Sequence, residues 1–102
     1  MRNQLLKNHQ TSGTGSTDWT IPAGATHVDV RYQPTEEATS EHRVAFRSAA
    51  AEVSLIGVVE SIGNYRFFNK IPATATLVRV TNGGAGPSVL YQQDVNFIVR
   101  VI

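Results

Sequence analysis

Apolar and polar residues alternate along most of this chain, and the alternation is clearest between residues 25 and 33. The positions that share one side of this stretch are apolar: Val28, Val30 and Tyr32. The positions that share the other side are polar: His27, Asp29 and Arg31. A period of two residues is that of a β-strand with one buried face. The pattern therefore predicts a half-buried strand.

Similar patterns predict further strands with turn residues between them: 42–47, 52–60, 64–70, 71–81, 88–92 and 95–102. The positions expected to face inward on the first two of these are apolar: Val44, Phe46, Val53, Leu55 and Val59. Turn residues at 61–64 predict a hairpin between the strands on either side. A helix over 40–56 is the competing interpretation, because apolar residues there also recur every three or four positions. The β-branched residues from Val53 onward favour strands.

Ten residues occur twice in the chain, fifty positions apart. Ile21–Val30 reads IPAGATHVDV and Ile71–Val80 reads IPATATLVRV, so that seven of the ten positions are identical. We expect the repeat to continue, with 44–46 aligned to 95–97. Two of the differing pairs occupy outward strand positions: His27/Leu77 and Asp29/Arg79. Those outward pairs, rather than the identical residues, are where we expect a partner to bind.

Seven or eight short strands separated by turns predict an all-β fold. The expected architecture is an antiparallel β-sandwich, jelly-roll-like, or a barrel, with an internal pseudo-repeat over residues 18–102. Residues 1–17 are small and polar and are expected to form a flexible N-terminal arm. Leu5 and Leu6 are then either incidental in a disordered tail or the anchor of an arm that orders on a neighbouring subunit.

Charged residues are sparse and almost balanced, at 17% of the chain with a net charge of +1. Lys and Arg are scattered singly, so the sequence offers no electrostatic case for nucleic acid or an anionic membrane. Cysteine is absent, which excludes disulfides and thiolate chemistry. The chain shows neither a signal peptide nor an apolar run of transmembrane length. We therefore expect a soluble protein.

No arrangement of residues in the sequence predicts catalysis, a cofactor or a metal. The three histidines lack the spacing of metal ligands: His9, His27 and His42. His27 and His42 are expected at the surface or at a sheet edge, since a site needs several converging ligands. The acidic stretch 36–41 is expected to be a solvated loop, with a weak cation site as the minor alternative. Glycines 83–86 lack the Lys and the following helix of a phosphate-binding loop.

Trp19 is the only tryptophan of the chain. In a small β-domain such a residue is usually part of the core or covers it. The alternative interpretation is a sugar-stacking platform of a carbohydrate-binding module.

The phrase Ile-Pro-Ala-Gly-Ala-Thr followed by alternating valines, present in two copies, resembles strand starts in small β-sandwich structural proteins of tailed-bacteriophage virions. These include capsid decoration (cement) proteins and tail or fibre-adaptor subunits. The resemblance implies a non-enzymatic virion protein, with capsid decoration as the preferred role. It also implies a homo-oligomer, with a trimer favoured, bound to a major capsid or other virion protein in a particle assembled in the host cytoplasm. No nucleic acid or membrane partner is expected.

The residues expected to contact a partner lie on the N-terminal arm, at its junction with the first strand, and at outward strand positions: Leu5, Leu6, Trp19, His27, Asp29, Ile56, Val58, Leu77, Arg79, Ile98 and Ile102.

Overall fold

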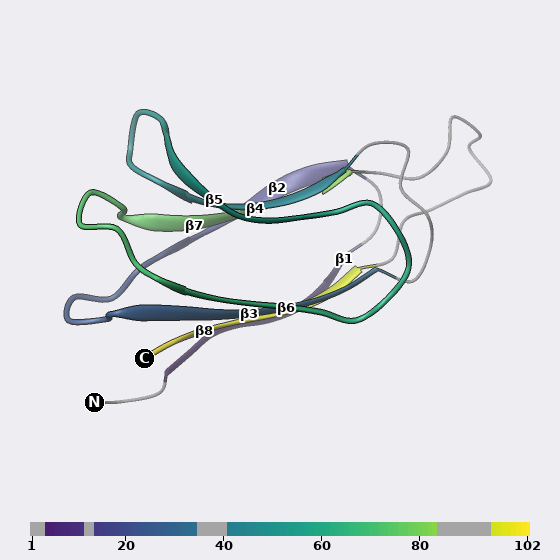
Figure 1. The fold of residues 1–102 in the computed structure, drawn as a ribbon, viewed down its shortest axis with the longest axis horizontal. Helices are drawn as coiled ribbons and strands as arrows, with labels where there is room; N and C mark the ends of the chain where they lie inside the picture. Colours follow the sequence, from purple (N-terminus) through teal and green to yellow (C-terminus); the bar gives the residue numbers. More distant parts are fainter. Residues whose placement is uncertain (1–3, 12–13, 35–40, 84–94) are drawn as a thin grey trace.

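The computed structural model describes residues 4–11, 14–34, 41–83 and 95–102, and this part of the chain is all-β, in two antiparallel sheets (Figure 1). Its strands are β1 Gln4–Thr11, β2 Thr14–Thr20, β3 His27–Pro34, β4 His42–Arg47, β5 Glu52–Val59, β6 Tyr65–Lys70, β7 Leu77–Gly83 and β8 Val95–Val101. The all-β antiparallel prediction is confirmed. The competing helix over 40–56 is wrong, because β4 and β5 occupy that stretch. Over the ranges described, no helix is present that could cross a membrane.

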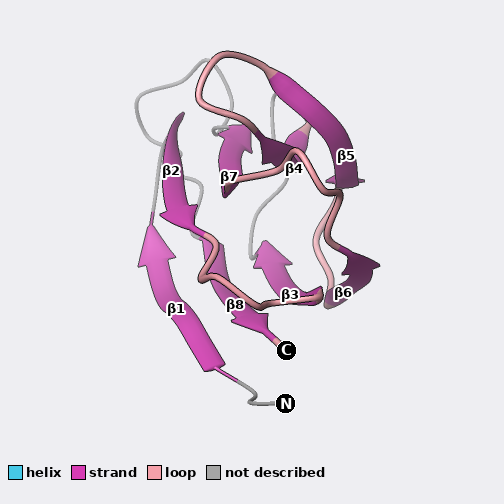
Figure 2. Ribbon diagram, turned by 90° about the vertical axis from the view of Figure 1, so that its left-hand side faces the viewer, coloured by secondary structure: helices cyan, strands magenta, loops and turns pink. Residues whose placement is uncertain are grey.

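The strand orders of the two sheets are β1-β8-β3-β6 and β2-β7-β4-β5. The sheets lie one above the other in Figure 1. Consecutive strands belong to opposite sheets at every step except from β4 to β5. β5 and β6 are edge strands of different sheets and lie on the same side of the molecule, at the right of Figure 2.

The core lies between the two sheets and is built from alternate strand positions. Val28, Val30 and Tyr32 of β3 are at most 1% exposed. They belong to one cluster with buried residues from four other described strands: Val44, Phe46, Ile56, Val59, Val78, Val80, Val99 and Val101. Burying a valine side chain fully contributes about 1.5–3 kcal/mol. The inward faces predicted for β3 and β4 are thus confirmed.

The inward face of β5 differs from the predicted one. Leu55, expected inside, is 43% exposed, whereas Ile56, expected to face a partner, is buried. The pairing with β4 skips a residue of β5 at two places. Val44 lies opposite Gly57 while Ala45 lies opposite Leu55, and further along Phe46 lies opposite Ser54 while Arg47 lies opposite Glu52. Ile56 is therefore the extra residue of a β-bulge, which exchanges the two faces of the strand. A period-two pattern cannot locate such a bulge.

Gly57 of β5 leaves room for the Phe67 ring of β6. A Cβ added at position 57 would overlap that ring, which packs against the core. We expect Gly57→Ala to lower the free energy of unfolding by about 1–3 kcal/mol through overpacking. Denaturant unfolding measures the loss, which should shrink when Phe67 is also changed to Leu. An equal loss in both backgrounds would show that the ring contact is not the cause.

The hairpin predicted between β5 and β6 is wrong. β5 pairs with β4, and β6 pairs with β3 in the other sheet. Residues 60–64 instead cross between the sheets, and the Gly63 N–H donates to the Pro34 carbonyl at the end of β3. Turn residues indicate that a chain reverses, but they do not specify whether its two arms pair with each other.

The N-terminal segment also differs from the predicted arm. β1 pairs with β8 from Gln4 to Thr11, and β2 pairs with β7 from Thr14 to Thr20. The small polar residues of this segment suggested that it could not bury enough surface to order. A strand ladder, however, is held by backbone groups, which Gly, Ser and Thr supply as well as apolar residues do. Within the described residues, sheet structure is therefore already present from Gln4, ahead of the predicted start at Asp18. The strand predicted at 88–92 lies outside the described residues.

Candidate functional site

Both copies of the repeated sequence form a turn with the same hydrogen bond. The Ala25 N–H donates to the Pro22 carbonyl at 3.3 Å, and the Ala75 N–H donates to the Pro72 carbonyl at 3.1 Å. Gly24 has a φ of 86°, which glycine adopts without steric cost. The repeated Pro-Ala-x-Ala motif thus encodes two loops that connect one sheet to the other, β2 to β3 and β6 to β7.

The two turns bond each other reciprocally. The Ile21 N–H donates to the Thr76 carbonyl at 2.9 Å, and the Ile71 N–H donates to the Thr26 carbonyl at 2.8 Å. Each copy therefore supplies one donor and one acceptor to the other. The identical residues of the repeat thus have a scaffold role at this end of the molecule.

An open groove of about 440 Å³ lies between the turns. Its lining comes almost equally from the two copies: Thr20, Ile21, Pro22, Ala23, Ala25, Ile71, Pro72, Ala73, Ala75 and Thr76. None of these side chains titrates near neutral pH, so the groove lacks a general acid or base. Its small apolar surface can accept an apolar side chain of another molecule.

Asp29 lies on the outer face of the sheet β1-β8-β3-β6, but it is not open to a partner as predicted. Its side chain is only 7% exposed. Arg66 donates to both carboxylate oxygens, from Nε at 2.9 Å and from Nη2 at 3.1 Å. Arg31 lies 3.9 Å away on the same carboxylate. Asp29 is therefore covered by a two-point ion pair, and this hydrogen bonding raises the pKa of Arg66.

His27 is half-buried on the same face, at the start of β3. Its ring stacks on Phe68 of β6, with the ring centres 5.3 Å apart and an angle of 11° between the planes. Phe68 itself is 52% exposed. The pair forms an aromatic ledge beside Asp29, since Phe68 lies directly opposite Asp29 across the two strands.

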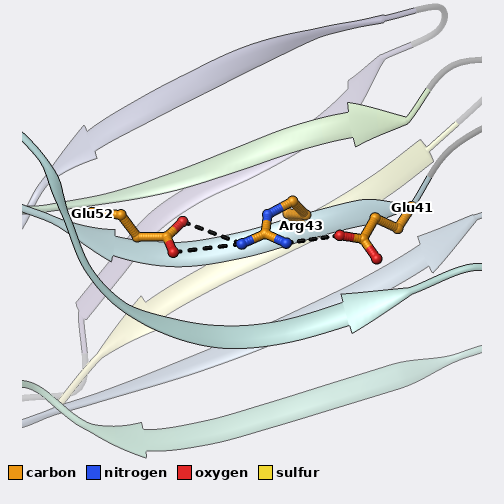
Figure 3. Close-up of polar contacts among 3 residues, drawn as sticks. All are labelled: Glu41, Arg43 and Glu52. Atoms are coloured by element: carbon orange, nitrogen blue, oxygen red, sulfur yellow. Dashed lines mark hydrogen bonds and ion pairs between the residues drawn. The ribbon is translucent and has the colours of Figure 1, made fainter.

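The outer face of the second sheet carries ion pairs. Arg79, predicted to face a partner, donates from Nε and Nη2 to the two oxygens of Asp18 at 2.7 and 2.9 Å. This hydrogen bonding lowers the pKa of Asp18. Arg43 lies between Glu41 at 2.7 Å and Glu52 at 3.4 Å (Figure 3). The charges of this face thus largely satisfy one another.

The remaining predicted contact residues are dispersed. Trp19 is half-buried, lies opposite Val78 and packs against the core, as expected for a residue that covers it. Three others are half-buried at separate places: Val58 on β5, Leu77 at the start of β7 and Ile102 directly after β8. Leu5, Leu6 and Ile98 lie on β1 and β8, but their side chains lie outside the described part, as do those of His9, Glu36 and Glu37. Among the predicted residues whose side chains are described, His27 and Asp29 share one sheet face, and Ile102 exchanges backbone hydrogen bonds with His27 at 3.0 and 3.3 Å.

His42 is a buried polar residue, 1% exposed, and not the surface histidine that was predicted. Its Nδ1 accepts the Gly83 N–H at 2.9 Å. The Tyr32 hydroxyl next to it donates to Asn82 Oδ1 at 2.7 Å, and the Tyr32 and His42 rings lie 5.3 Å apart. The sequence carries the signal for this position, because His42 precedes Val44 by two residues and so shares its inward face.

Acid is expected to destabilise the fold through His42. Burial lowers the pKa of His42 from its ordinary value of 6.5, and a hydrogen bond with Asn82 opposes this effect. The unfolded chain therefore takes up the proton at a pH at which the folded chain does not. Stability is complete above the unfolded pKa and falls as the pH drops below it. The loss is about 1.4 kcal/mol per pH unit until the folded pKa is reached.

Denaturant unfolding from about pH 7.5 to about pH 5, across the usual titration range of histidine, measures this slope. The control variant is His42→Asn, whose amide oxygen can still accept the Gly83 N–H but does not titrate. The variant should lose the extra acid sensitivity. The same slope in both proteins would assign that sensitivity to another group.

Within the described ranges, no three side chains of His, Asp or Glu are grouped so that they could hold a metal ion. No model of a known protein family matches this chain, and no curated protein does.

Proposed function

We infer that the two sheets form a jelly-roll β-sandwich whose halves, β1–β4 and β5–β8, are structurally equivalent. The register supports this inference. Thr20 lies opposite Leu77, and His27 lies opposite Lys70. A shift of fifty residues converts one pair into the other, because it carries Thr20 to Lys70 and His27 to Leu77. Strands of one half thus pair with strands of the other, β2 with β7 and β3 with β6.

The bonds at the ends of β4 and β8 extend this equivalence. The Thr76 N–H donates to the Arg47 carbonyl at 2.8 Å, and the Thr26 N–H donates to the Ile102 carbonyl at 2.7 Å. Arg47 and Ile102 therefore correspond. This correspondence aligns residues 44–46 with 99–101. The sequence pattern had instead aligned them with 95–97.

We propose that the protein is a non-enzymatic structural protein of a virus particle, a capsid decoration protein that binds the capsid as a homo-oligomer. The strand order β1-β8-β3-β6 over β2-β7-β4-β5 carries the proposal, because jelly rolls of eight strands recur in viral capsid proteins. This support is an analogy at the level of the fold. The apolar groove, which lacks titratable side chains, agrees with a binding role rather than catalysis.

The side of the molecule formed by β5 and β6 has two properties that favour self-association: exposed apolar side chains and unpaired strand edges. Within the described ranges, two of the three exposed large apolar side chains come from β5 and the crossing after it: Leu55 and Ile62, at 43% and 56% exposure. The third, Phe68 of β6, lies on the outer face of the sheet β1-β8-β3-β6. Both strands are sheet edges with unpaired backbone groups. Exposed edges that carry apolar residues are sites of association. We propose that a homo-oligomer, with a trimer favoured, forms here, leaving other faces for the capsid protein.

Light scattering after size exclusion tests the oligomer. The double variant Leu55→Glu/Ile62→Glu should be monomeric, whereas Ala49→Glu/Ala50→Glu, an equal charge change at the exposed β4–β5 turn, should leave the oligomer intact. A monomeric wild-type chain would refute the self-association.

The virion role is tested on particles. Virus particles purified from the source that encodes the chain should contain many copies of it, and gradient separation of capsids from tails should place it on capsids. Recovery with tails would support the alternative, a tail or fibre-adaptor subunit. Absence from both fractions would refute a virion role.

A carbohydrate-binding module remains the alternative from a different class, since lectins also use jelly rolls. The platform proposed for it, Trp19, is half-buried against the core. Glycan binding that quenches Trp19 fluorescence would favour this alternative over the decoration role.

A further inference from the structure

Charged residues that are far apart in the sequence lie together on one sheet face because of the strand register. Described residues of β3, β6 and β8 supply four cations and one acid to the outer face of the sheet β1-β8-β3-β6: Arg31, Arg66, Lys70, Arg100 and Asp29. Arg31 lies opposite Arg66, and Arg100 lies opposite Asp29. Residues directly opposite on neighbouring strands share a face. The face is therefore cationic although the chain is almost neutral.

Asp29 organises this face rather than neutralising it. Its carboxylate is buried beneath Arg66, and Arg31 approaches the same oxygens. Both arginine side chains remain more than half exposed, at 60% for Arg66 and 55% for Arg31. The buried carboxylate thus holds one guanidinium by two hydrogen bonds and attracts the second. Holding them in place reduces the rotamer entropy that binding would otherwise cost.

The outer face of the other sheet provides an internal comparison. There Arg79 is paired with Asp18, and Arg43 bridges Glu41 and Glu52. That face is therefore close to neutral. The segregation of charge between the two faces is not required by the core, since every one of these side chains is outward.

We propose that the outer face of the sheet β1-β8-β3-β6 binds a carboxylate-rich surface of a partner protein. Guanidinium groups match carboxylates with two parallel hydrogen bonds. Arginine and aromatic residues also dominate the binding energy of protein interfaces, and Phe68 lies within this face, 52% exposed. A single-stranded nucleic acid fits the face less well, because its successive bases stack on several aromatic rings, whereas one side of the Phe68 ring is already stacked on His27.

This inference does not rest on the virion role, because the face can be tested on the isolated chain. The probe is fluorescein-labelled poly-L-glutamate, with binding followed by anisotropy at low ionic strength. The variant Arg31→Gln/Lys70→Gln removes two cations and keeps the Asp29–Arg66 pair. Its control is Arg47→Gln/Arg79→Gln, which removes the same charge from strands of the other sheet.

We expect the wild-type chain to bind the probe and the affinity to fall as salt increases. The face variant should bind about tenfold more weakly, the effect of about 1.4 kcal/mol, while the control should stay within about twofold of wild type. Thermal unfolding checks that both variants are folded, and the single variant Arg31→Gln replaces the double one if it is not. Equal losses in the two variants, no binding at all, or tighter binding to single-stranded oligothymidylate than to polyglutamate would each overturn the proposal.

Discussion

Removal of residues 1–17 is expected to abolish cooperative folding rather than to leave a stable domain. The deletion removes all of β1 and most of β2, and with them the ladders to β8 and β7. It would uncover the backbone edges of two strands that contribute Val78, Val80, Val99 and Val101 to the core. Small domains are stable by only about 5–15 kcal/mol, so the loss of two strands exceeds the margin. Circular dichroism and thermal unfolding of the truncated chain measure the result.

A shorter deletion, of residues 1–11, serves as the graded comparison. It removes β1 but keeps β2 and its pairing with β7. We expect this variant to retain some folded structure with a lowered unfolding midpoint. A chain of residues 18–102 that unfolds at the wild-type midpoint would contradict the strand assignments and restore the flexible arm.

Replacing Tyr32 by Ala is expected to lower the free energy of unfolding by about 3–5 kcal/mol, the range for loss of a buried aromatic ring. Tyr32 is 1% exposed and is one of the largest fully buried side chains of the described part. The substitution would leave a cavity in the core and would also remove the donor to Asn82 Oδ1. Denaturant unfolding at neutral pH measures the loss.

Tyr32→Phe separates the two contributions, because it keeps the ring and removes only the hydroxyl. Loss of one partner of a buried hydrogen bond costs about 1–3 kcal/mol. The phenylalanine variant should therefore be more stable than the alanine variant. Equal losses of unfolding free energy in the two variants would mean that the ring contributes little to stability. That result would contradict its buried position in the core.

The sequence was sufficient to predict buried side chains where a strand is regular, because each residue then faces opposite to its neighbour. On β3 the alternation of Val28, Val30 and Tyr32 predicted the buried face, because a regular strand has a strict period of two. The same rule places His42 inside through Val44, but its polarity suggested a surface position. Only the fold shows that a backbone N–H, that of Gly83, is available to its ring.

The sequence was insufficient where the outcome depends on pairing between distant strands. The bulge at Ile56 and the crossing at 60–64 arise from what β5 and β6 meet in space. The candidate site shows the same limit. Asp29 was placed correctly on an outer face, but its cover, Arg66, comes from a strand 37 residues away. Both the ion pair and the cationic face depend on the register between strands, which the sequence pattern does not reveal.

The crossed pairing of the two halves has a consequence for synthesis on the ribosome. β2 and β3 find their partners only in β6, β7 and β8, and β8 lies between β1 and β3 in its sheet. Neither half can bury its apolar strand faces alone. The nascent chain must therefore keep its valine-rich strands exposed until residues 95–101 have been made. Folding is then expected to wait for β8 and to be slow, because every ladder except that of β4 with β5 joins strands distant in the sequence.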